Sequence, residues 1–138
     1  MIWKKHFTLD QLNEMGKHCA VGHLGIEISA YGENWIEAKM PVDHRTTQPF
    51  GLLHGGVSVA LAETIASLAG FLCIEEDQIA LGLDINANHL RPVKQGFVTA
   101  KATPIALSQN THVWQIDIRD EQDKLCCVSR LTLSIKHL

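Results

Sequence analysis

The sequence predicts an α+β protein in which one antiparallel sheet wraps around a single long central helix. Gly55-Gly56 opens an apolar segment that extends to Cys73, long enough for about five helical turns. After Asp77, four runs of residues alternate between apolar and polar, the pattern of strands covered on one face. Such strands must bury their apolar face against another layer, and the long helix is the sole candidate. We therefore expect the sheet to curl around it.

The length and composition indicate one domain, residues 1–138. The chain has 138 residues and 46% hydrophobic content, enough for a single core. A net charge of −3 without a basic run argues against a nucleic-acid partner. Met1–Phe7 lacks the continuous apolar stretch of a secretory signal, and the one long apolar segment contains Glu63, so we expect a buried helix and no membrane span.

The cysteines and histidines indicate neither a disulfide framework nor a metal site. Cys19, Cys73, Cys126 and Cys127 show no framework spacing and no Cys-x-x-Cys pattern. A reduced, cytoplasmic chain is the simplest account of them. The histidines contain no His-x-His or His-Glu-x-x-His pattern, so we expect no metal.

The N-terminal third is predicted to form a short helix, a hairpin and a loop. Thr8 and Gln11 make a capping-box pattern, and the helix that follows should end near Gly16. Residues 25–30 and 35–40 are typical of two strands joined by a turn at 31–34. Residues 41–51 are rich in turn formers, and this loop delivers the chain to the central helix.

The central helix carries one narrow face of small and polar residues. At about 100° per residue this face gathers Gly56, Ala60, Glu63, Ser67 and Gly70. A carboxylate in apolar surroundings is costly, which makes Glu63 a functional candidate, although a structural glutamate that bonds a backbone group or reaches water fits the helix pattern equally well. The start at His54-Gly55 favours function, because free N–H groups and the positive end of the helix dipole can stabilise a developing oxyanion.

Four strands are predicted in the C-terminal half, at 79–89, 96–107, 111–120 and 125–136. They are long, so one or two should bend at a bulge. A single curled sheet leaves edge strands and the small-residue face of the helix uncovered. A dimer that extends the sheet and covers this face would complete the fold, so we expect a homo-oligomer.

The order of these elements and the spacing Gln48…His54-Gly55-Gly56…Glu63…Ser67 resemble the hotdog-fold acyl-CoA thioesterases, in the branch with a carboxylate on the central helix. The resemblance covers the whole chain. It is close to the bacterial thioesterases that act on 1,4-dihydroxy-2-naphthoyl-CoA in menaquinone synthesis, and to a paralogue that clears mischarged aryl carriers in siderophore synthesis. It implies a hotdog fold and hydrolysis of an acyl-CoA, aromatic by preference, to the free acid and CoA.

The resemblance also implies roles for residues of this motif. Glu63 would attack the thioester carbonyl or activate water against it, while the backbone N–H of Gly55 polarises the carbonyl oxygen. Gln48 would lie beside the thioester, His54 near the leaving sulfur or the carbonyl, and Ser67 near the attacking water. If these three residues have no catalytic role, Gln48 is an ordinary loop residue, His54 is a helix cap, and Ser67 is a small residue that bonds the preceding turn.

For the CoA phosphates, the family pattern suggests His89, Arg91 and Arg130, with Ser108 or Gln109 on a nearby turn. Alternatively, the two arginines are solvated charges at strand ends. No metal is implied, and no cofactor other than the CoA of the substrate. The single-helix core and the uncovered small-residue face of the helix predict that the homo-oligomer is a homotetramer, built as a dimer of dimers whose active sites draw on two chains. An acyl or aryl carrier protein is an alternative thioester donor.

Two other functions remain open for such a chain. A non-catalytic module that binds acyl-CoA or an acyl carrier needs the same groove but no carboxylate, so Glu63 argues against it. Hotdog hydratases and dehydratases place a histidine and a carboxylate differently, and the spacing of Glu63 to Ser67 favours the hydrolase. Thiol release from an aromatic acyl-CoA separates the hydrolase from both alternatives.

Overall fold

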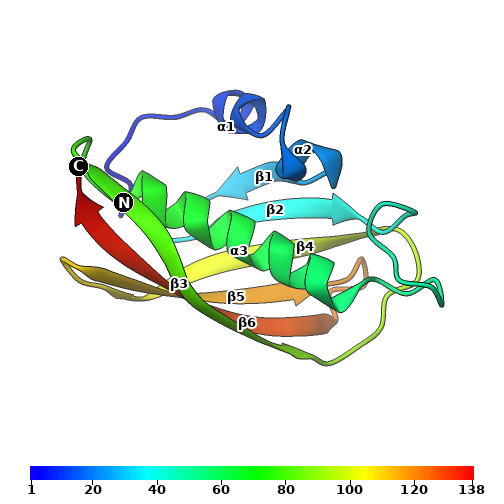
Figure 1. Ribbon diagram of the computed structural model, residues 1–138. Coiled ribbons are helices and arrows are strands. Elements are labelled where there is room, and N and C mark those ends of the chain that lie inside the picture. The colour runs from blue at the N-terminus through cyan, green and yellow to red at the C-terminus, as the bar shows by residue number, and fades with distance from the viewer.

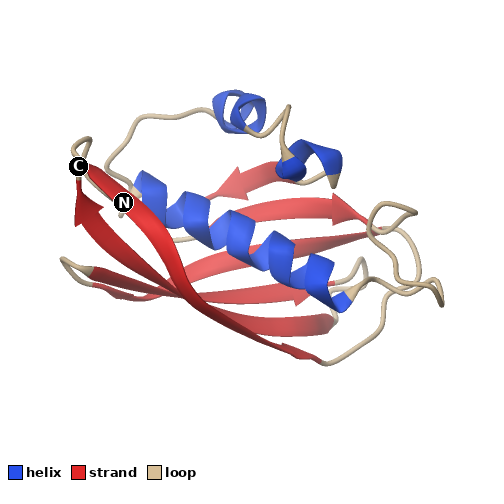
Figure 2. Cartoon of the chain, in the orientation of Figure 1, coloured by secondary structure: helices blue, strands red, loops and turns tan.

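The computed structural model describes residues 1–138 (Figures 1 and 2). Its elements in chain order are α1 (Leu9–Met15), α2 (Ala20–His23), β1 (Glu27–Tyr31), β2 (Ile36–Pro41), α3 (Gly55–Leu72), β3 (Gln78–His89), β4 (Phe97–Leu107), β5 (Thr111–Arg119) and β6 (Leu125–His137). All six strands belong to one sheet in the order β1-β2-β4-β5-β6-β3, and every neighbouring pair is antiparallel. Figure 1 shows α3 lying across one face of this sheet, which twists about the helix. The predicted fold class is confirmed.

Alternation along the strands gives the sheet one apolar face, which packs on α3. In β2 the even-numbered residues are buried, and each lies opposite a buried residue of β4, as in the pair Ala38–Ala100. The buried apolar residues of β2, β4 and β5 on this face are Ile36, Ala38, Met40, Val98, Ala100, Ala102, Trp114, Ile116 and Ile118, and the one buried polar residue beside them is His112. This burial is the main force that holds the sheet on the helix.

α3 is the core helix of the fold. By length and composition it is the one helix that could cross a membrane, but here one side of it packs against β2 to β6. Glu63 and Ser67 are half-buried, as expected for the polar face. Gly70 differs from the expectation, because it lies on the packed side, where a Cβ would clash with the side chain of Leu133.

The expected elements agree with the structure to within two residues at each end. The capping box is confirmed: the Gln11 N–H donates to Thr8 Oγ1 at 3.1 Å, and the Thr8 N–H donates to Gln11 Oε1 at 3.0 Å. Bulges are present, among them one in β3 between Gly82 and Asp84. The short α2 was not predicted, because one turn of helix that contains a glycine carries too little periodicity.

The two edges of the sheet differ. At β1, the side chain of Asn13 in α1 donates to the Ile28 carbonyl at 3.0 Å and accepts from the Ile28 N–H at 2.8 Å, so α1 occupies part of this edge. At β3, nothing covers the edge, and Leu81 and Leu83 are 47% and 66% exposed. An open, apolar edge of this length is a surface for strand pairing with another chain.

Candidate active site

The loop between β2 and α3 folds back on itself and holds Gln48 at its tip. The Gln48 N–H donates to the Leu52 carbonyl at 2.8 Å, and the Gln48 carbonyl accepts from the Gly51 N–H at 2.9 Å. Gly51 has a φ of +83°, a conformation that suits glycine. The Gln48 side-chain oxygen accepts from the Phe50 N–H, which leaves the amide NH₂ without a bond inside the chain.

An ion pair stabilises the turn at the start of the same loop. The Arg45 guanidinium donates to the Asp43 carboxylate at 2.7 Å, and this hydrogen bond lowers the pKa of Asp43 to about 2. The Asp43 carboxylate also accepts from the Arg45 backbone N–H at 2.9 Å. Asp43 is therefore ionised throughout the physiological range and keeps the turn closed.

His54 caps the N-terminus of α3. Its Nδ1 accepts from the Val57 N–H at 3.3 Å, which is the capping role that the sequence left as an alternative. Gly55 follows as the first helical residue, and its own N–H makes no hydrogen bond within the chain. The free N–H lies at the positive end of the helix dipole and can donate to a carbonyl oxygen or an anion.

A cleft of about 340 Å³ opens at this helix terminus. Among the groups that line it are Gln48, Gly55, His89 and Arg91. His89, the last residue of β3, packs so close to Gly55 that a Cβ there would stand 3.1 Å from the imidazole Nε2. No acidic side chain lines the cleft, so the helix dipole and Arg91 make it attractive to anions and polarised oxygens. His54 is not among the lining residues.

Glu63 and Ser67 lie further along α3. At 1.5 Å per residue, Glu63 is about 12 Å from Gly55 along the helix axis. The Glu63 carboxylate makes no hydrogen bond or ion pair within the chain and lies against the bulge of β3, where a Cβ at Gly82 would stand 2.8 Å from Oε2. The Ser67 hydroxyl likewise has no bond to the preceding turn, which removes the expected alternative for it. One chain therefore holds two separate halves of the predicted site.

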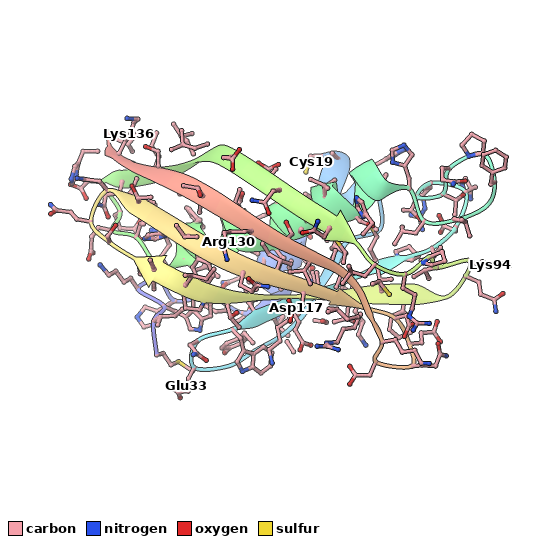
Figure 3. All side chains as sticks on the ribbon, turned by 90° about the horizontal axis from the view of Figure 1, so that it is seen from below. Cys19, Glu33, Lys94, Asp117, Arg130 and Lys136 are labelled. Atoms are coloured by element: carbon pink, nitrogen blue, oxygen red, sulfur yellow. The ribbon has the colours of Figure 1, made fainter.

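The residues suggested for CoA also lie apart. His89 and Arg91 line the cleft beside Gly55. Ser108 and Gln109 line a second cavity of about 420 Å³. Cys73 and Ile74 also line it, so it lies just beyond the C-terminal end of α3. The Ser108 hydroxyl donates to the Thr111 carbonyl at 2.7 Å. Arg130 is exposed on the face of the sheet away from α3 (Figure 3). A single chain does not bring these residues together.

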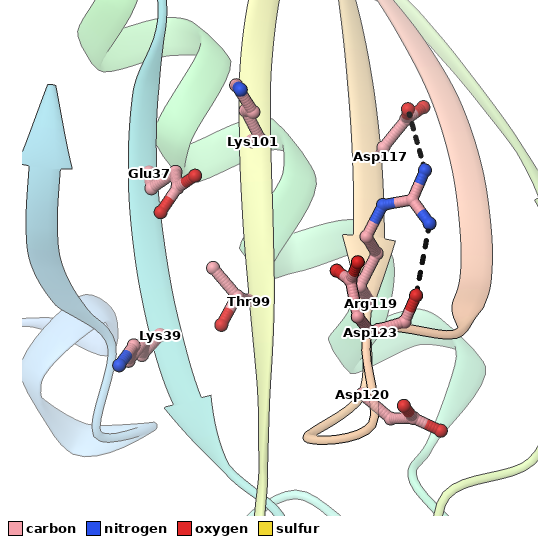
Figure 4. A pocket seen from close by; sticks show the side chains of 8 residues that line it. All are labelled: Glu37, Lys39, Thr99, Lys101, Asp117, Arg119, Asp120 and Asp123. Atoms are coloured by element: carbon pink, nitrogen blue, oxygen red, sulfur yellow. Dashed lines mark hydrogen bonds and ion pairs between the residues drawn. The ribbon is translucent and has the colours of Figure 1, made fainter. Parts of the chain in front are cut away.

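The largest cavity, about 610 Å³, lies on the outer face of β2, β4 and β5 (Figure 4). No apolar residue lines it. Arg119 forms an ion pair with Asp117 at 3.9 Å and donates to the Asp123 carbonyl at 3.2 Å. Glu37, Lys39 and other charged side chains complete the lining. This cavity faces away from α3 and from every residue of the predicted catalytic set.

Comparison with known families identifies the class of protein. The model of the thioesterase superfamily matches residues 50–127, which include the helix terminus at Gly55, the carboxylate of Glu63 and the whole of β3. This chain belongs to the thioesterase superfamily. It is a thioester hydrolase with a hotdog fold.

Named relatives of this thioesterase match it over nearly its full length. The 1,4-dihydroxy-2-naphthoyl-CoA hydrolase of Escherichia coli is 53% identical over 135 residues, 98% of this chain and 99% of the relative. The proofreading thioesterase EntH of Cronobacter turicensis is 49% identical, covering 98% of each chain. A thioesterase from Haemophilus influenzae with a solved structure is 72% identical and superposes with a TM-score of 0.99, covering 100% of this chain and 96% of the other.

Two residues that the sequence did not single out contact the candidate site. Gly82 adjoins the carboxylate of Glu63, and Thr46 anchors the loop of Gln48. A lone glycine inside a strand pattern signals a bulge or a close approach, so Gly82 could have been found. Thr46 gave no signal, because its importance depends on hydrogen bonds that only the folded loop creates.

Proposed function

We propose that this thioesterase hydrolyses aromatic acyl-CoA thioesters, with Glu63 of one chain and the Gly55 N–H of a second chain acting on the same carbonyl. The proposal rests on one observation: Glu63 and Gly55 lie at separate positions along α3. A hydrogen-bond donor to the carbonyl oxygen must lie within about 3.1 Å of it. Because Glu63 is about 12 Å from Gly55 along the helix axis, one chain cannot supply both groups to one thioester.

The open edge of β3 provides a way to join the two halves. Along this strand Gly82 adjoins Glu63 and His89 adjoins Gly55. A twofold axis passing near Ile85 would pair two β3 strands antiparallel and set Gly82 opposite the partner's His89. The Glu63 carboxylate would then face the partner's Gly55, and one dimer would contain two complete sites.

The chemistry needs only the groups that this dimer would assemble. In one route Glu63 takes a proton from water, whose oxygen forms a bond to the thioester carbon while the C–S bond breaks. In the other, the carboxylate oxygen attacks the carbon, and water then hydrolyses the mixed anhydride. Both routes yield a carboxylic acid and a thiolate, and the thiolate takes up the proton that water gave up, which restores the Glu63 carboxylate. The thiolate is a good leaving group, so no metal or cofactor is required.

The remaining predicted residues fit a larger assembly. The free amide of Gln48 would contact the thioester, Ser67 would hold the attacking water, and His54 would act through its cap on the helix start. Arg91 and His89 would meet the CoA phosphates beside the cleft, whereas Ser108, Gln109 and Arg130 would reach CoA from another dimer. This division supports a homotetramer.

The aromatic preference and the cellular role rest on the relatives. One relative is named for its action on 1,4-dihydroxy-2-naphthoyl-CoA, and another is named a proofreading thioesterase, which supports a role in menaquinone synthesis and an aryl carrier protein as second thioester donor. All four cysteines are free, which supports a cytoplasmic location.

Mixing two inactive chains tests the shared site. Glu63→Gln and Gly55→Pro chains, each inactive alone, are co-expressed and purified together. If the site is shared, each heterodimer has one intact site, with Glu63 from one chain and Gly55 from the other, and one site that lacks both groups. At equal expression half of the dimers are heterodimers, so about a quarter of all sites recover activity. If each chain holds its own site, no mixture recovers activity, and the proposal is wrong.

A substrate panel tests the acyl preference. Release of thiol is followed for an aromatic acyl-CoA, a short-chain acyl-CoA and palmitoyl-CoA. We expect the highest kcat/KM for the aromatic substrate. Equal or better turnover of palmitoyl-CoA would contradict the preference, and no thiol release from any of them would favour a non-catalytic module or a hydratase.

A further inference from the structure

Thr46 is fully buried within a loop whose other residues are mostly accessible. Its hydroxyl donates to the Pro41 carbonyl at 2.8 Å, with a longer contact of 3.4 Å to the Asp43 carbonyl. The same oxygen accepts from the Asp43 N–H at 3.0 Å. One hydroxyl thus ties the loop to the end of β2 and to the turn stabilised by Arg45.

The backbone of Thr46 holds the other end of the loop. Its carbonyl accepts from the His54 N–H at 2.9 Å, directly before Gly55. The neighbouring Thr47 pairs with Leu53, whose N–H donates to the Val93 carbonyl at 2.8 Å. Thr46 therefore connects the last residue of β2 with the cap of α3, and Gln48 lies in the small closed loop between these ends.

We propose that Thr46 is a positioning residue that fixes Gln48 and the Gly55 N–H relative to each other. The inference rests on the proposed function, since these two groups are assigned there to the thioester. Without the hydroxyl, the Pro41 carbonyl and the Asp43 N–H lose their partner at a part-buried position, and polar groups shielded from water are costly to leave unpaired. The loop then relaxes to satisfy them, and the donor and the amide move out of alignment. Displacements of about 1 Å can cost 10²-fold in rate.

Two substitutions of Thr46 distinguish a positioning role from one that only fills space. Valine has the shape of threonine but no hydroxyl, whereas serine keeps the hydroxyl and lacks the methyl group. A residue that merely fills the core would tolerate Thr46→Val and suffer from Thr46→Ser. A positioning residue that acts through its hydroxyl shows the opposite order.

The test compares Thr46→Val, Thr46→Ser and a control, Thr8→Val, with the intact enzyme. Thr8 caps α1 and has no link to the loop, so Thr8→Val removes a threonine hydroxyl that bonds the backbone far from Gln48. We expect Thr46→Val to lower kcat at least about tenfold with a small change in KM, as misalignment predicts. Thr46→Ser restores kcat, and Thr8→Val leaves it unchanged. Melting temperatures confirm that all variants are folded.

A second measurement separates this inference from the proposed function. Hydrogen exchange of the His54 and Gln48 amides reports the closure of the loop whatever the site binds. We expect both amides to exchange faster in Thr46→Val and at the wild-type rate in Thr46→Ser. If the wild-type enzyme cleaves no acyl-CoA, the proposed function fails, and exchange alone decides the role of Thr46. Unchanged exchange in Thr46→Val, or wild-type kcat in that variant, overturns the inference.

Discussion

The carboxylate of Glu63 lies directly against the backbone of Gly82, where the bulge of β3 meets the middle of α3. A Cβ at Gly82 would stand 2.8 Å from Oε2 of Glu63. Glycine at this bulge leaves room for a carboxylate that has no hydrogen-bond partner within the chain. The bulge therefore sets where the carboxylate can lie.

Gly82→Ala should displace this carboxylate and leave the fold intact. The added methyl group meets the end of a flexible side chain, so Glu63 can rotate away at little cost in stability. We expect kcat to fall about tenfold or more, since misplaced reacting groups lose rate steeply. Steady-state kinetics and a melting curve check this. The effect should be much smaller in a Glu63→Asp background, where the shorter side chain does not reach the methyl group; an undiminished effect there would contradict the contact.

Glu63→Gln keeps the shape of the side chain but removes its charge. An amide cannot attack the carbonyl or deprotonate water, so kcat should fall at least about 10²-fold, while KM changes little. The melting temperature should be unchanged or slightly higher, because a half-buried, unpaired carboxylate is costly. Glu63→Asp should lie between the two. A folded Glu63→Gln enzyme with near wild-type turnover would make the carboxylate structural.

Gly55→Pro removes the proposed carbonyl donor while keeping the helix. Proline is tolerated at the first helical position, and His54 before it has φ −67° and ψ 127°, which a following proline accepts. Losing one such donor should lower kcat about 10²–10³-fold. Gly55→Ala retains the N–H and is the matched control, since its methyl group also approaches His89. Equal kcat in both variants would exclude the Gly55 N–H from catalysis.

The sequence predicted the elements better than the site. Periodicity located α3 and the long strands, because alternation and helical spacing follow directly from burial. It also placed Glu63 on a half-buried face and Gly55 at a helix start. Their spacing on one helix also implies that they lie about 12 Å apart in a single chain. The sequence could not reveal that Gly82 adjoins the carboxylate or that Thr46 closes the loop of Gln48. Those relationships depend on strand register and loop hydrogen bonds, which no local pattern encodes.

His112 should make stability depend on pH. Its side chain is 4% exposed and its Nδ1 has no protein partner, and burial, with a smaller effect from Lys4, lowers its pKa below the usual 6.5. At pH values between the lowered pKa of His112 in the folded chain and 6.5, the imidazole binds a proton in the unfolded chain but not in the folded chain. The free energy of unfolding should therefore decrease as the pH falls below about 6.5. Melting curves from pH 7.5 to 5 should show a shallower decline for His112→Phe, and an identical decline would contradict the assignment.

Leu83→Asp should break the proposed dimer. Leu83 is the extra residue of the β3 bulge and is 66% exposed on the open edge, so a charge there is harmless to the monomer but is costly where a partner strand covers it. Sedimentation should show smaller species than the wild type, and activity should fall with the dimer because each site needs groups from two chains. Met15→Asp, at an equally exposed position on α1, is the control and should change neither property. A Leu83→Asp monomer with full activity would show that one chain suffices, whereas an intact, active oligomer would place the interface elsewhere than this edge.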